Sequence, residues 1–172
     1  LVRARGCGAV IYRRADDYKV WHADDTEQDP AEWLRFGKKI RSLIGRDVDI
    51  VFEHPGRSTM GASVFVAKRG GMIITCAATS GFKIEYDNRY LWMNQKTLKG
   101  CHFANYREAW EANRLIGEGR IHPVLSAVFP FERVADAVNQ VHHNVHEGKL
   151  GVLVLAPEEG LGVTDTELRA EH

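Results

Sequence analysis

Three apolar runs along the chain each stop abruptly at polar or turn-forming residues. They are DVDIVFEHPG at residues 47–56, GGMIITCAATSG at residues 70–81 and KGCHFANY at residues 99–106. Helix-like segments separate the runs, which is typical of parallel strands joined by crossover helices. We therefore predict an α/β fold whose parallel strands end at a common edge. The expected strands lie at about residues 9–12, 49–53, 72–77 and 100–104.

The segment before the first run carries clear helix signals. Asp29 is a natural N-cap, Pro30 suits the first helical position, and Glu32 stands three residues after the cap. Apolar residues then recur at helical spacing until Gly45 ends the pattern. Residues 13–28, which precede this helix, are charged and aromatic without clean periodicity, and we interpret them as an insertion or long loop.

Further elements follow the same rules. Ser58 or Thr59 is expected to cap a second helix that ends at the glycine pair 70–71, and another helix is expected at residues 106–115. Valines at helical spacing predict an amphipathic helix at residues 131–146. That helix stands between two expected strands, at residues 124–129 and 152–155.

The two ends of the sequence predict different structures. Residues 1–5 have the pattern of a helix end, and the acidic tail, residues 157–172, is expected to be surface-bound or mobile. No G-x-G-x-x-G motif occurs near the start, although a dinucleotide fold needs that turn for its pyrophosphate. Either the fold is of another kind, or its first strand and loop lie upstream of residue 1.

Composition narrows the possible partners. The 172 residues suffice for one domain, or a domain plus part of another. Lys plus Arg equals Asp plus Glu at 23 each, so we expect no general attraction to nucleic acid or to an anionic membrane. No apolar run approaches the roughly 20 residues that span a bilayer. Three cysteines are too few for a disulfide framework and fit a reducing cytoplasm.

The expected strand ends carry the candidate chemistry. In open α/β sheets ligands bind in the crevice at the carboxyl ends of the strands, so we expect His54, the turn at 77–81 and His102 to face a common ligand. Small residues in that turn let a flat ligand approach the backbone. His54 could instead be a capping or packing residue, and His102 a histidine satisfied in the core. As a ligand-facing group, His102 could donate a hydrogen bond or act as an acid.

A metal site is not expected. His142, His143 and His146 include a pair at spacing i, i+4, but they lie beside a valine stripe and lack a carboxylate at zincin spacing. We interpret them as solvated helix side chains. The chain also has no CxxC motif.

Several long strings resemble a known family. The last third, VFPFERVADAVNQVHHNVHEGKLGVLVL, resembles the closing segment of medium-chain dehydrogenases/reductases. DIVFEHPGR, GGMIITCAATSG, EYDNRYLWM, GCHFANYREAWEANRLI and the tail string EGLGVTD resemble crotonyl-CoA carboxylase/reductases, so the resemblance covers essentially the whole chain. Cys101, where that family usually has serine, and the segment MNQKTL depart from the pattern and bear on acyl-chain preference.

This resemblance implies a fold and an activity. Residues 1–122 would be the later part of an NADPH-binding Rossmann domain, and residues 123–172 a strand–helix–strand that returns to a GroES-like catalytic domain. The enzyme would be a cytoplasmic, zinc-independent homo-oligomer, a dimer or tetramer. It would use NADPH to reduce an α,β-unsaturated acyl-CoA and add CO2, giving an alkylmalonyl-CoA. A plain enoyl-CoA reductase and a non-catalytic fragment acting in assembly are the alternatives.

The resemblance also implies roles for single residues. His102 matches the family's histidine that holds CO2, whereas its partners, including a glutamate, would lie outside this chain. The residues expected to bind the cofactor are His54, Pro55, Cys76, Ala77, Ala78, Thr79, Ser80, Gly81, Phe103 and Asn105.

Overall fold

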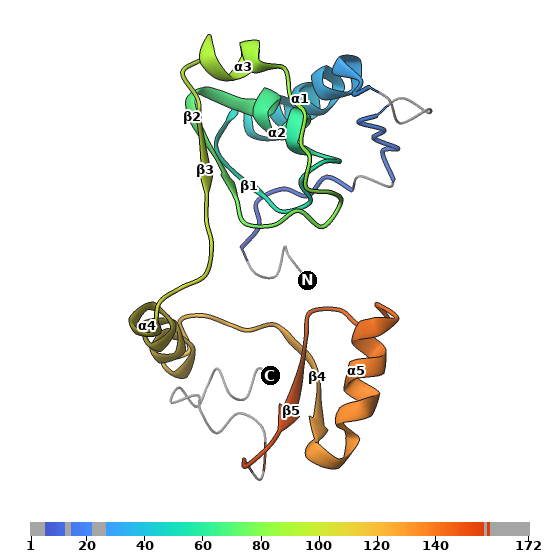
Figure 1. Ribbon diagram of the computed structural model, residues 1–172, viewed down its shortest axis with the longest axis vertical. Helices are drawn as coiled ribbons and strands as arrows, with labels where there is room; N and C mark the ends of the chain where they lie inside the picture. Colours follow the sequence, from blue (N-terminus) through green and yellow to red (C-terminus); the bar gives the residue numbers. More distant parts are fainter. Residues whose placement is uncertain (1–5, 13–14, 22–26, 157, 159–172) are drawn as a thin grey trace. The chain divides into compact units, whose positions relative to one another are not determined.

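The computed structural model describes residues 6–12, 15–21, 27–156 and 158. They form an α/β structure in two compact units, residues 1–102 and 103–172 (Figure 1). The predicted helix end at residues 1–5 and almost all of the predicted tail lie outside the described residues. No helix in the described part of the chain is both long and apolar enough to cross a bilayer. The division at residue 122 that we predicted for the complete protein stays a prediction.

The first unit is built on a parallel three-stranded sheet. Its strands are β1 (Val48–Glu53), β2 (Ala67–Thr75) and β3 (Thr97–Gly100), in the order β1-β2-β3. Both pairs are parallel, as the alternation of apolar runs and helices predicts. β3 ends at Gly100, where the predicted strand begins, so the predicted range 100–104 is wrong. Beyond Gly100, only the bond from the Cys101 N–H to the Thr75 carbonyl (2.8 Å) continues toward β2 among the backbone bonds described.

Helix α1 (Pro30–Ile44) follows the sequence signals closely. The Asp29 side chain accepts the Ala31 N–H at 2.8 Å and thereby caps the first turn. At the other end, Gly45 adopts φ 76° and donates its N–H to the Arg41 carbonyl. Because only glycine takes this left-handed conformation without strain, its position fixes the end of the helix.

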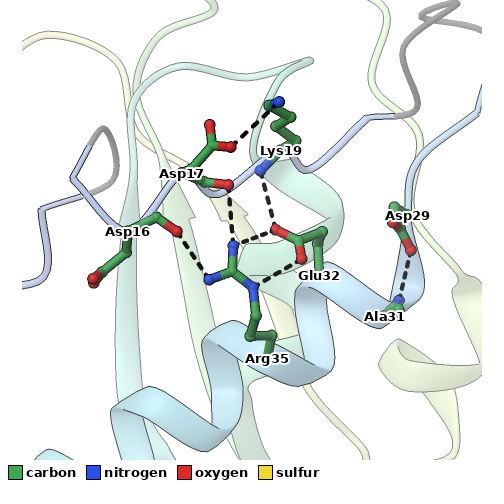
Figure 2. Close-up of polar contacts among 7 residues, drawn as sticks. All are labelled: Asp16, Asp17, Lys19, Asp29, Ala31, Glu32 and Arg35. Atoms are coloured by element: carbon green, nitrogen blue, oxygen red, sulfur yellow. Dashed lines mark hydrogen bonds and ion pairs between the residues drawn. The ribbon is translucent and has the colours of Figure 1, made fainter.

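Glu32 and Arg35 fasten the preceding loop to α1 (Figure 2). The Glu32 carboxylate accepts the backbone N–H of Lys19 at 3.1 Å and two hydrogen bonds from the Arg35 guanidinium. Arg35 also donates to the carbonyls of Asp16 and Asp17. Residues 16–19 of the segment that we interpreted as a loop are therefore held by side chains of the helix. Hydrogen bonds from Arg35, and then from the Lys19 amide, lower the pKa of Glu32.

A pH dependence follows for Glu32→Gln, which removes the charge that these donors stabilise. Because the folded-state pKa of Glu32 is lowered, its stabilising contribution is present above the unfolded pKa and is lost as pH falls through the folded value. We expect the variant to unfold at lower urea concentration than the wild type at pH 7. The difference between the two midpoints should shrink in acid below the ordinary glutamate range. A difference that stays constant with pH would contradict this assignment.

One face of the sheet carries the core of the first unit. The register aligns Val51, Ile73 and Leu98 on the three strands. They pack against α2 (Met60–Val66), through the fully buried Met60 and Val64, and against residues of α3 (Asn88–Trp92). On the opposite face of β1, Ile50 and Phe52 are 62% and 69% exposed. Parallel sheets are normally covered on both faces, whereas the described residues leave Ile50 and Phe52 of β1 largely exposed.

Further predictions for the first unit are also wrong. The second helix ends at Val66 rather than at the glycine pair 70–71, and β2 starts directly after it. The predicted strand at residues 72–77 therefore starts too late and ends too late, since β2 runs from Ala67 to Thr75, although its register with β1 is regular only from Met72 onward. Residues 9–12 form no strand. Among the described residues β1 pairs only with β2, so residues 9–12 have no strand with which to form backbone hydrogen bonds.

The second unit contains α4 (Tyr106–Gly117) and a two-stranded parallel sheet. The strands are β4 (Leu125–Pro130) and β5 (Lys149–Leu153), joined through the short helix η2 (Phe131–Arg133) and α5 (Val134–His142). The strand–helix–strand order is as predicted. The predicted helix to residue 146 is too long, because Asn144 takes φ 53° and ends the helical path after the cap at His143. β5 begins three residues before the predicted range 152–155 and ends within it, at Leu153.

Candidate functional site

The three strands of the first unit end level with one another. Glu53 pairs with Thr75, and Thr75 pairs with Gly100, so each strand stops at the same edge of the sheet (Figure 1). His54, Cys76 and Cys101 are the next residues along the chain, and all three are exposed. The expectation that these strand ends share one edge is confirmed for β1, β2 and β3.

The loops that leave β1 and β2 are tied together by hydrogen bonds. The Pro55 carbonyl accepts both the backbone N–H of Ser80, at 2.8 Å, and its hydroxyl, at 2.6 Å. The Ser80 hydroxyl oxygen in turn accepts the Ser58 N–H at 2.9 Å. Arg57 donates its backbone N–H to the Gly81 carbonyl at 3.3 Å. The predicted proximity of residue 54 and the turn at 77–81 thus rests on four bonds between their loops.

Two glycines allow these loops to approach closely. Gly56 has φ 85°, and a Cβ placed there would lie 3.0 Å from the Ala78 Cα and 3.0 Å from the Gly81 carbonyl oxygen. Gly81 has φ 136°, and a Cβ there would lie 3.2 Å from the Cβ and the Cδ of Arg57. A side chain at either position would strain the backbone and press on the opposite loop. The two loops are therefore closely packed against each other.

The structure places the predicted cofactor residues in two groups. The first unit holds His54 and Pro55 on one loop and Cys76 to Gly81 on the other; of these, Pro55, Ala77, Ala78 and Gly81 are partly buried and the others are exposed. His102 is exposed just after β3, at the end of the same unit. Phe103 and Asn105 belong to the second unit.

Those two residues have local roles that the sequence did not suggest. Asn105 is the N-cap of α4: its side chain accepts the Glu108 N–H at 3.0 Å, and the Glu108 carboxylate accepts the Asn105 N–H at 2.9 Å. This reciprocal pair is a capping box. Phe103 has φ 52° and is 88% exposed. Its backbone conformation is uncommon for a residue with a side chain and redirects the chain between β3 and α4.

The histidines of the second unit have contacts among themselves and with the backbone. The rings of His142 and His143 meet edge to face with centroids 5.0 Å apart, and the His146 Nδ1 lies 3.0 Å from the Gly148 carbonyl oxygen. In the described part of the chain, no three His, Cys, Asp or Glu side chains are grouped so that they could hold a metal ion.

Sequence reasoning missed Glu53 as a site residue. We treated it only as the last position of a strand, yet its side chain is 2% exposed and accepts hydrogen bonds from the loop that follows. The available signal was a carboxylate closing the apolar run DIVFE immediately before His-Pro-Gly. A charge in that place needs buried partners, and hydroxyl groups stand nearby at Thr59 and Ser63.

Comparison with protein families identifies the family to which the chain belongs. The sequence model of the family described as zinc-binding dehydrogenase matches residues 18–152. The chain belongs to this family.

Individual relatives narrow the resemblance. The chain is 60% identical over 173 residues to crotonyl-CoA reductase of Streptomyces avermitilis, covering 100% of this chain and 39% of the relative. It is 43% identical over 169 residues to crotonyl-CoA carboxylase/reductase of Cereibacter sphaeroides, covering 93% and 39%. A solved structure of the 2-octenoyl-CoA carboxylase reductase CinF, in complex with NADP and 2-octenoyl-CoA, is 45% identical. It matches with a TM-score of 0.79 over 99% of this chain and 38% of that chain.

These matches confirm the resemblance that the sequence strings indicate. They also set its extent, because the chain spans about two fifths of the length of the curated relatives it matches.

Proposed function

We propose that the full-length protein is an NADPH-dependent reductive carboxylase. It would convert an α,β-unsaturated acyl-CoA of the crotonyl-CoA type and CO2 into an alkylmalonyl-CoA such as ethylmalonyl-CoA. The observation that carries this proposal is the 45% identity, over 99% of the chain, to a carboxylase reductase solved with NADP and an enoyl-CoA. The level strand ends and the close-packed loops beyond them are consistent with a ligand at this edge of the sheet.

The cofactor would be held by the two loops of the first unit. Small residues in these loops suit close approach of a flat ring to the backbone and hydrogen bonding to its amide. His54, Pro55, Cys76 and residues 77–81 are the proposed contacts in this unit, and Phe103 and Asn105 are proposed in the second. When bound, NADPH would supply the hydride for the β-carbon, which leaves the substrate's α-carbon nucleophilic as an enolate.

His102 would serve the carboxylation step. Carbon dioxide is a weak, uncharged ligand that must react with the enolate before a proton does. An imidazole N–H directed at one oxygen of CO2 stabilises the negative charge that develops there as the new C–C bond forms. The exposed position of His102 immediately beyond β3 is compatible with this role.

Two alternatives have specific support. The first alternative is a plain enoyl-CoA reductase, which the name of the 60% identical relative, crotonyl-CoA reductase, supports. In that case a proton, rather than CO2, would add to the α-carbon. The second alternative is a fragment that acts only in assembly, because the chain spans about two fifths of the length of its relatives. NADPH titration of the 172-residue chain addresses that reading.

The full-length protein should incorporate labelled bicarbonate. We expect incubation with NADPH, crotonyl-CoA and ¹³C-bicarbonate to yield alkylmalonyl-CoA that is heavier by one labelled carbon, detected by mass spectrometry. An unlabelled saturated acyl-CoA as the sole product would identify a plain reductase. No NADPH oxidation at all would overturn both enzymatic assignments.

The cellular setting also belongs to the proposal. We place the protein in the cytoplasm as a homo-oligomer, a dimer or tetramer, that binds acyl-CoA and neither nucleic acid nor membrane. The three free, exposed thiols of Cys7, Cys76 and Cys101 suit a reducing compartment. Light scattering of the purified full-length protein would measure the oligomer.

A further inference from the structure

A buried carboxylate lies directly beneath the candidate cofactor loops. Glu53 is 2% exposed and is the one charged side chain buried within the described residues. It closes β1 and, by the alternation of a strand, projects to the same side of the sheet as Val51, the side that α2 covers. Burying an ionisable group is costly unless hydrogen bonds replace its water. The hydrogen-bond partners of Glu53 therefore indicate which part of the structure this buried carboxylate stabilises.

Three donors surround the carboxylate. Oε1 accepts the Gly56 backbone N–H at 2.9 Å and the Thr59 hydroxyl at 2.7 Å, and Oε2 accepts the Ser63 hydroxyl. The first two donors belong to the loop that follows Glu53 itself, and the third to α2. A carboxylate is suited to this arrangement because it offers only acceptor sites. The side chain thus bends the loop back over the end of its own strand.

The bond to Gly56 connects this carboxylate with the second loop. Gly56 is the residue at which an added Cβ would lie only 3.0 Å from both the Ala78 Cα and the Gly81 carbonyl oxygen. The preceding carbonyl, of Pro55, accepts both hydrogen bonds from Ser80. The Glu53 main chain also accepts the Cys76 N–H at 3.4 Å. Glu53 therefore contacts one loop with its side chain and the start of the other with its backbone.

We infer that Glu53 is a positioning residue for the nicotinamide half of NADPH: its carboxylate fixes Gly56 and thereby holds the 54–59 and 77–81 loops in register. This inference rests on the proposed cofactor site, since Glu53 is buried beneath the loops and acts through them. The reach of the carboxylate, rather than its charge, is the property that matters. Gly56, Thr59 and Ser63 all depend on acceptor oxygens at the end of a side chain of this length.

Two conservative variants of the full-length protein separate reach from charge. Glu53→Asp keeps the charge but withdraws the oxygens by one methylene, so the Gly56 N–H loses its acceptor. Glu53→Gln keeps the length: its amide oxygen can face Gly56 and Thr59, while its NH₂ can donate to the Ser63 hydroxyl. Val64→Ala serves as a control, because it removes core packing from α2 at a 1% exposed position without changing any of the three donors to Glu53.

We expect Glu53→Asp to raise the KM for NADPH about tenfold, which is the effect of one lost hydrogen bond, while kcat falls less. Glu53→Gln should keep this KM within about twofold of the wild-type value. Val64→Ala should lower the unfolding midpoint without changing that KM. In cofactor-free protein, amide hydrogen exchange in peptides covering residues 54–59 and 77–81 should accelerate in the Asp variant and stay slow in the Gln variant.

The outcomes distinguish this inference from the proposed function. Unchanged KM and unchanged exchange in Glu53→Asp would overturn the positioning role while leaving the reductase assignment intact. A KM rise of equal size in Val64→Ala, or in both Glu53 variants, would also overturn it, since stability or charge would then be the cause. If the wild type failed to bind NADPH, the proposed function would fall, and accelerated exchange in the Asp variant alone would still support the tie between the loops.

Discussion

His102→Ala in the full-length protein is expected to shift the product from alkylmalonyl-CoA towards saturated acyl-CoA. The proposed role of His102 is to donate to a CO2 oxygen that becomes a carboxylate, so its removal should slow C–C bond formation more than hydride transfer. One hydrogen bond to a group that develops charge contributes roughly 1.5–3 kcal/mol. The ratio of the two products should therefore change about ten- to hundredfold. NADPH oxidation should persist, though more slowly.

The measurement is the ratio of the two acyl-CoA products at fixed bicarbonate. His102→Gln, whose amide can still donate, should recover part of the carboxylation, whereas His143→Ala, at the cap of α5, should leave the ratio at the wild-type value. An unchanged ratio in His102→Ala, with both steps slowed equally, would make His102 a structural or substrate-positioning residue instead.

The parallel sheet could be predicted because local and tertiary preferences agree there. The runs around DIVFE and GGMIIT are apolar on both sides, as strands buried in a parallel sheet require, and each ends at turn-forming residues. Asp29, Pro30 and Gly45 are likewise strong local signals, and α1 begins and ends where they place it. Such elements need no knowledge of distant residues.

The errors occur where a distant partner or a single dihedral angle decides. Residues 9–12 have a strand-like composition, but no described strand pairs with them. The helix after Thr59 stops at Val66 because the chain joins β2, with an irregular register, before the glycine pair. In the second unit, the valine spacing continues to Val145, yet the positive φ of Asn144 ends the helical path. Hydrophobic periodicity carries none of this information.

The candidate site was predictable as a location and incomplete as a mechanism. The sequence indicated that His54 and the turn ending at Gly81 would meet, and the bonds between Pro55 and Ser80 bear this out. The carboxylate that closes the run DIVFE was a signal, but it did not decide that Glu53 is buried, because a terminal carboxylate on a strand is as compatible with solvent as with a buried network. The assignment of individual residues to cofactor and CO2 stays a prediction for the experiments described above.

Gly81→Val is expected to weaken NADPH binding by tenfold or more, about the effect of one strained backbone position. Gly81 has φ 136°, a region that a β-branched residue adopts only with strain. A Cβ would also lie 3.2 Å from the stem of Arg57, whose N–H bonds the Gly81 carbonyl. The substitution should therefore separate the two loops as well as add bulk beneath the cofactor. Isothermal titration of the full-length protein with NADPH measures the change.

Gly8→Val is the matched control, since the space around Gly8 is open within 4 Å and its φ is not in the left-handed region. We expect this control to bind NADPH with the wild-type dissociation constant. Gly81→Val should lose affinity for NADPH but keep its affinity for the acyl-CoA. Titration with crotonyl-CoA alone checks that second condition. Equal affinity for NADPH in Gly81→Val and wild type would show that the 77–81 loop does not approach the cofactor, and the nicotinamide half would have to be placed against other residues.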